Sequence, residues 1–360
     1  MGTSPEPAEA AAGSAAAPGG SNRRRTIAIA VIAGLVVIAV AAAVFLLNRP
    51  RTETAAPAQT SAPAPETPTP EPTPEPTPTP TPDPPPAALN ILLVGSDSRI
   101  NERAVAASGA TSDQRGDALV LLHLPADRQN IYGISIMRDL WVDIPGRGAA
   151  KVNAGLELGG VPLMTQTVEA LLGQPINHTV MADFQGFAAM TDALGGVDVN
   201  ITQPFTSTVD DIFYFPPGVN RLSGVQALAF VRERHAFSDG DYQRVRNQQT
   251  FLKAMMAKMA AEGALADRNT VKLLVSTVLP HVTVSPGLTV ETLEQLAFSL
   301  RSTPPGNGLF FTLPTAGAGF SRDGQSIILQ NPAATAAVSA ALATGTLGDY
   351  IAANGLQGGN

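Results

Sequence analysis

The sequence contains no cysteine, only one tryptophan and an excess of acidic over basic residues. Without cysteine, a disulfide framework, a zinc–thiolate site and a cysteine nucleophile are all excluded. Lysine and arginine number 23 against 30 aspartates and glutamates, and the formal net charge of -7 removes the electrostatic case for nucleic-acid binding. Neither a Walker loop nor a GxGxxG fingerprint is present, which argues against an ordinary nucleotide site.

The N-terminal part of the chain predicts a membrane anchor. Residues 1–25 are too poor in large apolar side chains to fold, end in three arginines, and are expected to be a disordered cytoplasmic N-terminus. Residues 26–47 carry no charge, and as a helix they would span about 33 Å, enough to cross a bilayer core of about 30 Å. Two arginines follow on the far side, so the positive-inside rule favours a cytoplasmic N-terminus modestly. The alternative is a cleaved signal peptide, although the apolar run exceeds the usual length of about 7–15 residues.

A proline-rich linker separates this segment from the rest of the chain. The predicted linker covers residues 48–87, and 14 of its residues between 57 and 86 are proline. Alternating Thr-Pro and Glu-Pro steps favour a polyproline II stalk, whose last 20 residues would span about 60 Å. We expect a folded domain at residues 88–262 and a mainly helical C-terminal extension, packed on it, at residues 263–360.

Apolar runs alternate with helical patterns from residue 88 onward, which predicts an α/β fold. We expect a three-layer α/β/α sandwich with a mixed central sheet. The runs that predict strands are residues 90–94, 118–124, 131–137, 178–182 and 309–313. The segments that predict helices are residues 161–172, 184–194, 271–279, 288–300 and 332–346, with a further long helix starting near residue 241.

Two aspartates stand at predicted strand ends. Asp97 follows the first strand and Asp117 opens the next, so neighbouring strands would let both carboxylates share one Mg²⁺ ion. The alternative is that Asp97 caps a turn and Asp117 pairs with Arg115.

Arginines occupy the ends of several predicted elements. Arg138 lies directly beyond a buried strand, at a sheet edge where α/β proteins bind ligands, although a surface ion pair with Asp139 explains it equally well. If the segment LAFVRERHA is extended, Arg232 and Arg234 lie on one face, where their like charges favour an anion between them.

The long helix adds to this pattern. Arg244 falls in its opening turns, where backbone N–H groups and the helix dipole also favour an anion, and Gln248 follows one turn later. Because the guanidinium fork matches phosphate oxygens, the arginines together predict a site for a di- or polyphosphate. The alternative is a solvated strand end beside an ordinary basic helix surface.

Other candidates carry less information. His178 and His235 lack partners at ligand spacing and are expected to be structural. Ser96 and Ser98 have no Ser-His-Asp context. Trp141 is expected in the core.

Residues 89–259 resemble the LytR-CpsA-Psr family of bacterial cell-envelope proteins. The fragments that carry the resemblance are, in order, ILLVGSDSR, RGDALVLL, ISIMRDLWVDIPG, KVNAG, FQGFAAMTDALGGVDVNI, LSGVQALAFVRER and GDYQRVRNQQTFL. The joint order is more specific than any single fragment, and the anchored N-terminus also resembles the family. The resemblance implies transfer of a glycopolymer phosphate from a polyprenyl-pyrophosphate carrier onto a peptidoglycan hydroxyl, by an extracytoplasmic domain on a single-pass membrane protein.

The resemblance also implies roles for individual residues. Asp97 and Asp117 match the family's metal-binding aspartates, which take Mg²⁺ or Mn²⁺. The positions that match the family's pyrophosphate-binding arginines are Arg138, Arg232, Arg234 and Arg244. The positions that match further family motifs are Arg115, Lys151, Asn153 and Gln248.

The sequence departs from the family pattern at three places. Met137 replaces a usual proline, Asn247 replaces a common arginine, and the segment between Asp97 and Asp117 is expanded. These departures leave the implied ligands in place and bear instead on the preference for glycan and acceptor.

Several functions remain compatible with the sequence. In the transferase mechanism the lipid tail lies in an apolar groove, and positioning and charge stabilisation replace a covalent nucleophile. The general base is not identified; Asp241 is one candidate, with helix capping as its alternative role. The other functions are a polyprenyl-pyrophosphate phosphohydrolase, a non-enzymatic envelope regulator and a lipid-binding protein.

Overall fold

The structure is a computed structural model. It describes residues 87–96, 103–112, 114–209, 211–261, 267–304 and 306–356. The predicted N-terminus, the predicted membrane segment at 26–47, nearly all of the linker and Asp97 lie outside these residues. Within the described ranges, the helices are too short or too polar to cross a bilayer.

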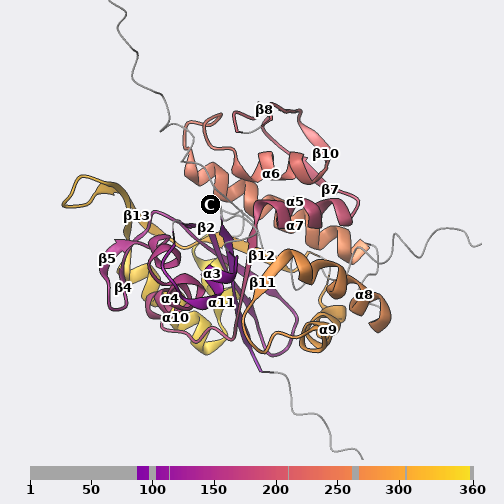
Figure 1. Ribbon diagram of the computed structural model, residues 1–360, viewed down its shortest axis with the longest axis horizontal. Coiled ribbons are helices and arrows are strands. Elements are labelled where there is room, and N and C mark those ends of the chain that lie inside the picture. Colours follow the sequence, from indigo (N-terminus) through magenta and orange to yellow (C-terminus); the bar gives the residue numbers. More distant parts are fainter. Residues whose placement is uncertain are drawn as a thin grey trace, which may run out of the picture.

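A mixed sheet of six strands forms the centre of the fold (Figure 1). Its strands are β1 (Leu89–Ser96), β2 (Gly116–Leu124), β3 (Ile131–Ile136), β6 (His178–Asp183), β11 (Val282–Val284) and β12 (Gly308–Thr312). They lie in the order β11-β6-β1-β2-β3-β12. β1 pairs in parallel with β6 and β3 with β12, whereas the other neighbours are antiparallel. The prediction of a mixed central sheet is therefore confirmed.

Both faces of the sheet are buried. Alternate side chains of each strand point to opposite sides, and each side packs in an apolar core. In β1, Ile91 and Leu93 belong to one apolar core, and Leu92 and Val94 belong to the other. The helices over the first core are α5 (Phe184–Ala193), α6 (Gly224–Arg232), α7 (Asp241–Ala261), α8 (Arg268–Val278) and α9 (Val290–Ser299). The helices over the second core are α3 (Arg103–Ser108), α4 (Ala154–Leu172), α10 (Pro332–Thr344) and α11 (Leu347–Ala353).

Two-stranded sheets and 3-10 turns complete the described fold. The strands outside the central sheet are β4 (Trp141–Ile144) with β5 (Gly148–Lys151), β7 (Val197–Ile201) with β10 (Gly218–Leu222), β8 (Phe205–Thr206) with β9 (Tyr214–Phe215), and β13 (Thr315–Phe320) with β14 (Ser326–Gln330). The 3-10 turns are η2 (Leu279–His281) and η3 (Leu300–Ser302). The β13–β14 hairpin extends from the body of the molecule beside β4 and β5 (Figure 1).

Most of the predicted elements are present, and glycines end two of the helices as expected. Gly173 adopts a left-handed φ of 60° after α4, and its N–H bonds the Glu169 carbonyl. Gly195 and Gly196, with φ of 69° and 84°, turn the chain after α5. A side chain disfavours this conformation, so glycine at these positions fixes where the helices stop.

The prediction of an extended segment before Arg232 was wrong. The stretch is the helix α6, and Arg232 is its last residue. Ser223 and Gln226 form a reciprocal capping box at its start, which supplies partners for the first free N–H groups. The chain becomes extended only at Glu233, so Arg232 and Arg234 do not share a strand face.

The C-terminal segment contributes strands as well as helices. β11 and β12 occupy the two edges of the central sheet. β12 pairs along β3, with Gly308 opposite Ile131 and Thr312 opposite Ser135. Just before β12, Asn307 Nδ2 donates to the carbonyl of Gln129, 178 residues earlier in the chain.

Candidate functional site

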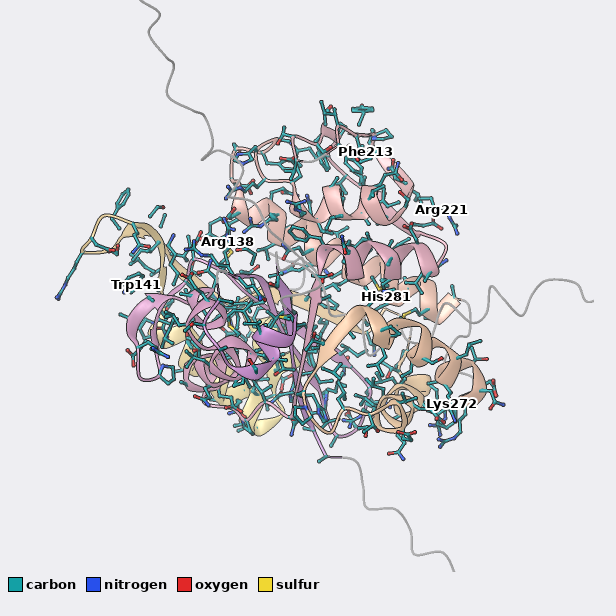
Figure 2. The ribbon with its side chains drawn as sticks, viewed as in Figure 1. Arg138, Trp141, Phe213, Arg221, Lys272 and His281 are labelled. Atoms are coloured by element: carbon teal, nitrogen blue, oxygen red, sulfur yellow. The ribbon has the colours of Figure 1, made fainter. Side chains whose placement is uncertain are left out.

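Three arginines from separate elements surround one carboxylate. Asp241 is the first residue of α7, and its Oδ2 lies 3.1 Å from Arg244 Nη2 and 3.4 Å from Arg138 Nε. Its Oδ1 accepts from Arg234 Nη1 at 3.3 Å. Arg138 comes from the turn after β3, Arg234 from the turn between α6 and α7, and Arg244 from the first turns of α7. The predicted convergence of these three arginines is therefore present in the fold, around Asp241. Figure 2 labels Arg138 among the side chains of the molecule.

Arg138 also contacts a carboxylate of the neighbouring strand. Its Nη1 donates to Asp117 Oδ1 at 2.9 Å, and both side chains are less than 10% exposed. Because β2 and β3 are adjacent and antiparallel, the start of β2 lies beside the end of β3. Asp139 lies 3.6 Å from Arg138 Nε and 3.1 Å from Lys151 Nζ. The site therefore combines alternating positive and negative groups at one edge of the sheet.

The charges of the site shift one another's pKa values. Burial would lower the pKa of Arg138, but Asp117, Asp241 and Asp139 outweigh it and hold that pKa above its ordinary value. Burial would raise the pKa of Asp241, whereas Arg244, Arg138 and Arg234 bring it below its ordinary value. Asp241 is therefore held in its ionised form, and its negative charge keeps the three guanidinium groups together.

Arg244 has spare capacity to bind an anion. Burial and the nearby Arg138 lower its pKa to about 10, although Asp241 and Asp117 act in the opposite direction. Its Nε and Nη1 are buried, and neither has a hydrogen-bond partner among the described residues. Unsatisfied buried donors on a charged group are costly, and an anionic ligand would relieve that cost.

Arg232 and Gln248 lie beside this group rather than in it. The Arg232 guanidinium stacks over the Phe184 ring at 4.2 Å, at the start of α5. Gln248 Nε2 donates to the Val231 carbonyl at 3.4 Å, and Asn247 Nδ2 donates to that of Phe230 at 3.1 Å. These amides join the end of α6 to α7, which fixes the position of the turn that carries Arg234.

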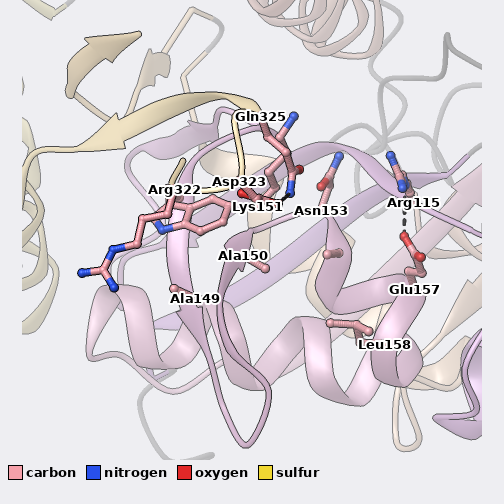
Figure 3. Close-up of a pocket in the computed structure, with 12 residues that line it drawn as sticks. Arg115, Ala149, Ala150, Lys151, Asn153, Glu157, Leu158, Arg322, Asp323 and Gln325 are labelled. Carbon is pink, nitrogen blue, oxygen red and sulfur yellow. Dashed lines mark hydrogen bonds and ion pairs between the residues drawn. The ribbon is translucent and has the colours of Figure 1, made fainter. Parts of the chain in front are cut away.

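The remaining predicted residues line an adjoining cleft of about 780 Å³ (Figure 3). Lys151 closes β5, and Asn153 precedes α4, with its N–H bonded to the Arg138 carbonyl at 3.2 Å. Arg115 lies further along the cleft, where its Nε donates to Glu157 Oε2 at 3.0 Å. These three residues therefore border the arginine group, and Lys151 joins its ion pairs through Asp139.

Comparison with known proteins identifies the family. Residues 62–327 match the sequence model of the LytR_cpsA_psr family. The chain belongs to this family.

The family includes curated relatives and solved structures. The chain is 34% identical over 220 residues to the probable cell wall biosynthesis protein LcpB of Corynebacterium glutamicum, covering 60% of this chain and 52% of that protein. It is 34% identical over 178 residues to the polyisoprenyl-teichoic acid–peptidoglycan teichoic acid transferase TagU of Bacillus cereus, covering 49% of this chain and 54% of that protein. The chain thus spans about half the length of these relatives.

Solved structures share the fold. B. subtilis TagV superimposes with a TM-score of 0.59 at 21% identity, covering 72% of this chain and 97% of TagV. TagT bound to LI-WTA superimposes with a TM-score of 0.56 at 23% identity, covering 73% of this chain and 91% of TagT. The LytR_cpsA_psr fold therefore accounts for the sheet and its covering helices.

Asp117 is the described member of the two carboxylates that the family resemblance assigns to a metal ion. Asp117 offers the hard oxygen donor that Mg²⁺ prefers, at the buried start of β2. Ser96, the residue before Asp97, pairs across the sheet with Gly116, the residue before Asp117. Among the described residues no three histidine, aspartate or glutamate side chains gather as a metal site, and Asp97 is outside them. Asp117 therefore matches the donor type of such a site, and the described residues alone do not form it.

Sequence reasoning gave Glu233 no function, yet its carboxylate organises the turn beside the site. Glu233 is fully buried, and its Oε1 accepts from the N–H groups of Arg234, His235 and Ala236 at 2.8, 2.7 and 3.0 Å. Thr208 donates to the same carboxylate through its backbone N–H and its hydroxyl. The signal available in the sequence was a glutamate between two arginines. That pattern does not predict that Glu233 is buried, because its burial depends on contacts distant in sequence.

The expectation that Trp141 lies in the core was wrong. In β4, Val142 and Ile144 point inward, whereas Trp141 is half-buried and lines the cleft. A two-stranded hairpin covers the core with one face only, so alternation leaves the indole on the other face.

Proposed function

We propose that this protein transfers a glycopolymer phosphate from a polyprenyl-pyrophosphate carrier to a peptidoglycan hydroxyl. The observation that carries the proposal is the convergence of Arg138, Arg234 and Arg244 on Asp241 at the sheet edge. Membership of the LytR_cpsA_psr family and the likeness to a teichoic acid transferase support it. We further propose that residues 26–47 anchor the protein in the cell membrane, with the catalytic domain outside.

The arginines would bind the pyrophosphate. Planar guanidinium forks pair with phosphate oxygens in two-point geometry, and three of them from separate elements would fix both phosphates. Asp241 holds the forks at this spacing before the substrate arrives, so little reorganisation is needed on binding.

Transfer would proceed by displacement at phosphorus. The oxygen of the acceptor hydroxyl forms a bond to the phosphorus that bears the glycan, and the bond from that phosphorus to the bridging oxygen breaks. Polyprenyl phosphate leaves with the bonding electrons, and the hydroxyl proton passes to a base. Arg138, Arg234 and Arg244 would stabilise the negative charge on the phosphoryl oxygens and on the leaving group. Positioning and charge stabilisation are the main requirements of such a reaction.

Asp97 and Asp117 would hold Mg²⁺ or Mn²⁺ beside the pyrophosphate. When bound, the cation would neutralise phosphate charge and assist the leaving group. Asp117 would at the same time orient Arg138 through its 2.9 Å hydrogen bond.

Asp241 is better suited to positioning than to proton transfer. A general base works best with a pKa near the working pH, whereas three arginines lower the pKa of this carboxylate. We therefore assign Asp241 to the alignment of the arginines and leave the base unassigned.

The lipid chain would lie on the face of the sheet that α8 and α9 cover. A small cavity of about 10 Å³ between β6, β11, α8 and α9 is lined by valine and leucine side chains.

The test uses the full chain in detergent with a polyprenyl-pyrophosphate-linked sugar, peptidoglycan fragments and Mg²⁺. Release of polyprenyl monophosphate and labelling of the acceptor are followed together. We expect acceptor-dependent transfer that is lost in Arg138→Ala and Asp117→Ala and kept in Arg221→Ala. Arg221 is the matched control, because it is exposed and bonds the Gly195 carbonyl away from the site (Figure 2).

Other outcomes would identify the alternatives. Release of polyprenyl monophosphate without acceptor labelling would replace the proposal with a phosphohydrolase. Lipid binding without turnover, unaffected by Asp117→Ala, would replace it with a lipid-binding protein. Protection of the domain from a protease added outside intact cells would contradict the extracytoplasmic placement and favour a regulator.

A further inference from the structure

The cleft beside the arginines has a composition that the pyrophosphate does not explain. Its described lining comes from the β4–β5 hairpin, the start of α4, the tip of the β13–β14 hairpin and Arg115, just before β2. The volume of about 780 Å³ is within the range of about 300–1,000 Å³ typical of small-molecule pockets.

An aromatic ring and small neighbours form one side of the cleft. Trp141 lies opposite Lys151 in the antiparallel β4–β5 pair, so both side chains project from the same face. Ala149, Ala150 and Ala154 also line the cleft, and their short side chains leave room beside the indole. A half-exposed tryptophan with space in front of it offers a flat apolar surface and one N–H donor.

Polar groups surround this ring, but their charges nearly cancel. Arg115 is paired with Glu157 at 3.0 Å, and Lys151 is paired with Asp139 at 3.1 Å. Arg322 and Asp323, of opposite charge, are neighbours in the chain at the rim, where the Arg322 guanidinium extends away from Asp323 (Figure 3). The cleft therefore suits a neutral ligand that carries many hydroxyl or amide groups, whereas the arginine group suits an anion.

The rim is a preformed turn rather than a loose loop. Ser321 Oγ accepts from Gln325 N at 3.0 Å, and Gln325 Nε2 donates to Asp323 Oδ2 at 2.6 Å. These bonds, with Gly324 at a φ of 81°, hold Arg322, Asp323 and Gln325 over the cleft.

Both walls of the cleft are tied to the arginine site. Ile328 N, in β14, donates to the Asp139 carbonyl at 2.8 Å, and Asn153 N donates to the Arg138 carbonyl at 3.2 Å. Tyr242, next to Asp241, shares a hydrogen bond of 3.1 Å with Thr315 in β13. A ligand in the cleft would therefore lie next to a pyrophosphate held by Arg138.

We propose that this cleft binds a saccharide ring of a glycan substrate, with Trp141 stacked on the ring's C–H face and Asp323, Gln325 and Glu157 bonded to its hydroxyl or amide groups. The proposal rests on the proposed function, since it places the sugar beside the phosphorus that reacts. A pyranose has an apolar face and a polar edge, which match the indole and the rim. The sugar could belong to the donor glycan or to the acceptor, and the experiment distinguishes them.

The single tryptophan of the chain is a built-in reporter of this cleft. Intrinsic fluorescence of the full chain in detergent would be titrated with farnesyl-pyrophosphoryl N-acetylglucosamine as donor probe and with peptide-free peptidoglycan disaccharide as acceptor probe. Farnesyl pyrophosphate, which has no sugar, is the control ligand. We expect one or both sugar probes to produce a saturable change in emission that is larger than the change with farnesyl pyrophosphate.

Variants test the named contacts. Gln325→Ala is expected to raise Kd for the responding probe about three- to tenfold, as loss of one or two hydrogen bonds would. Gln129→Ala, at an exposed glutamine beyond β2, is the matched control and should leave Kd unchanged. Trp141→Ala, followed by calorimetry, should weaken sugar binding about tenfold while inorganic pyrophosphate still binds.

The inference is overturned if neither sugar probe changes the emission more than farnesyl pyrophosphate does, or if Trp141→Ala and Gln325→Ala bind both probes as wild type does. Because binding is measured without turnover, its failure is separate from failure of the transferase. Turnover with no response from the cleft refutes this inference alone. A response without turnover refutes the proposed function alone.

Discussion

At the scale of single residues, the site depends on one carboxylate shared by three guanidinium groups. Without Asp241, the like charges of Arg138, Arg234 and Arg244 would repel one another. The sequence placed these arginines at element ends, which indicated an anion site. It did not indicate Asp241 as their shared counter-ion. That contact joins Arg138, in the turn after β3, to the first residue of α7, more than a hundred residues later.

Replacing Asp241 tests its electrostatic role. The arginines lower its pKa in the folded state, so its stabilising contribution is complete above the unfolded pKa and is lost as pH falls through the lower, folded pKa. We expect Asp241→Asn to lower the free energy of unfolding by about 3 kcal/mol at pH 7, as loss of one partner of a buried pair does. The deficit should shrink as pH falls below about 4, measured by urea unfolding with circular dichroism.

Asp143→Asn is the control for this experiment. Asp143 is exposed on β4, so its replacement should change stability by no more than about 0.5 kcal/mol. A deficit in Asp241→Asn that stays constant down to pH 3 would contradict the electrostatic role.

Anion binding should stabilise the protein through the same residues. Arg244 bears a pKa lowered to about 10 by burial and by Arg138, and a bound pyrophosphate would favour its charged form. Inorganic pyrophosphate at about 100 times its Kd should add about 2.7 kcal/mol of stability. The rise in Tm should be at most half as large in Arg234→Ala and unchanged in Arg221→Ala. An equal rise in all three proteins would place the anion elsewhere.

At the scale of elements, sequence patterns predicted buried strands and glycine-terminated helices well. Apolar runs such as residues 118–124 are unambiguous, and Gly173 ends its helix because glycine readily adopts a left-handed φ. The segment before Arg232 was misassigned because a short apolar run fits a strand or a buried helix equally. Trp141 was misplaced for a related reason, since hydrophobicity does not tell which face of a hairpin is covered.

The turn between α6 and α7 provides the prediction at this scale. Glu233 accepts three successive backbone N–H groups there, and Glu233→Ala would remove that acceptor from all three. We expect the free energy of unfolding to fall by about 3 kcal/mol or more, measured by chemical denaturation. Pyrophosphate affinity should fall as well, because Arg234 belongs to the same turn.

Glu233→Gln keeps one acceptor oxygen and gives the comparison for this variant. Its loss of stability should be intermediate, because an amide oxygen can still accept some of these bonds. If Glu233→Ala unfolds like wild type, the carboxylate does not determine the turn.

At the scale of the whole molecule, the central sheet joins distant parts of the chain. β12 completes the edge next to β3, and Phe310 and Phe311 place their rings in the two cores. Sequence analysis predicted this strand, but not its neighbour, because strand order depends on packing between segments far apart in sequence.

Truncation tests whether the fold needs this segment. A chain that ends at residue 302 loses β12, the β13–β14 hairpin, α10 and α11, and with them buried side chains of both cores. We expect it to show no cooperative thermal transition in near-ultraviolet circular dichroism, whereas a chain that ends at residue 356 should unfold like wild type. Cooperative unfolding of the shorter chain would show that residues 88–302 form an independent domain.

The pairing of Asn307 with Gln129 has a consequence for how the protein folds. Contacts between residues 178 positions apart are among the last that a growing chain can form, and such distant contacts are associated with slow folding. Until β12 has been synthesised, β3 has an open edge that can pair with another chain. The nascent protein therefore passes through a period in which aggregation competes with completion of the sheet, and that period ends only when β12 is in place.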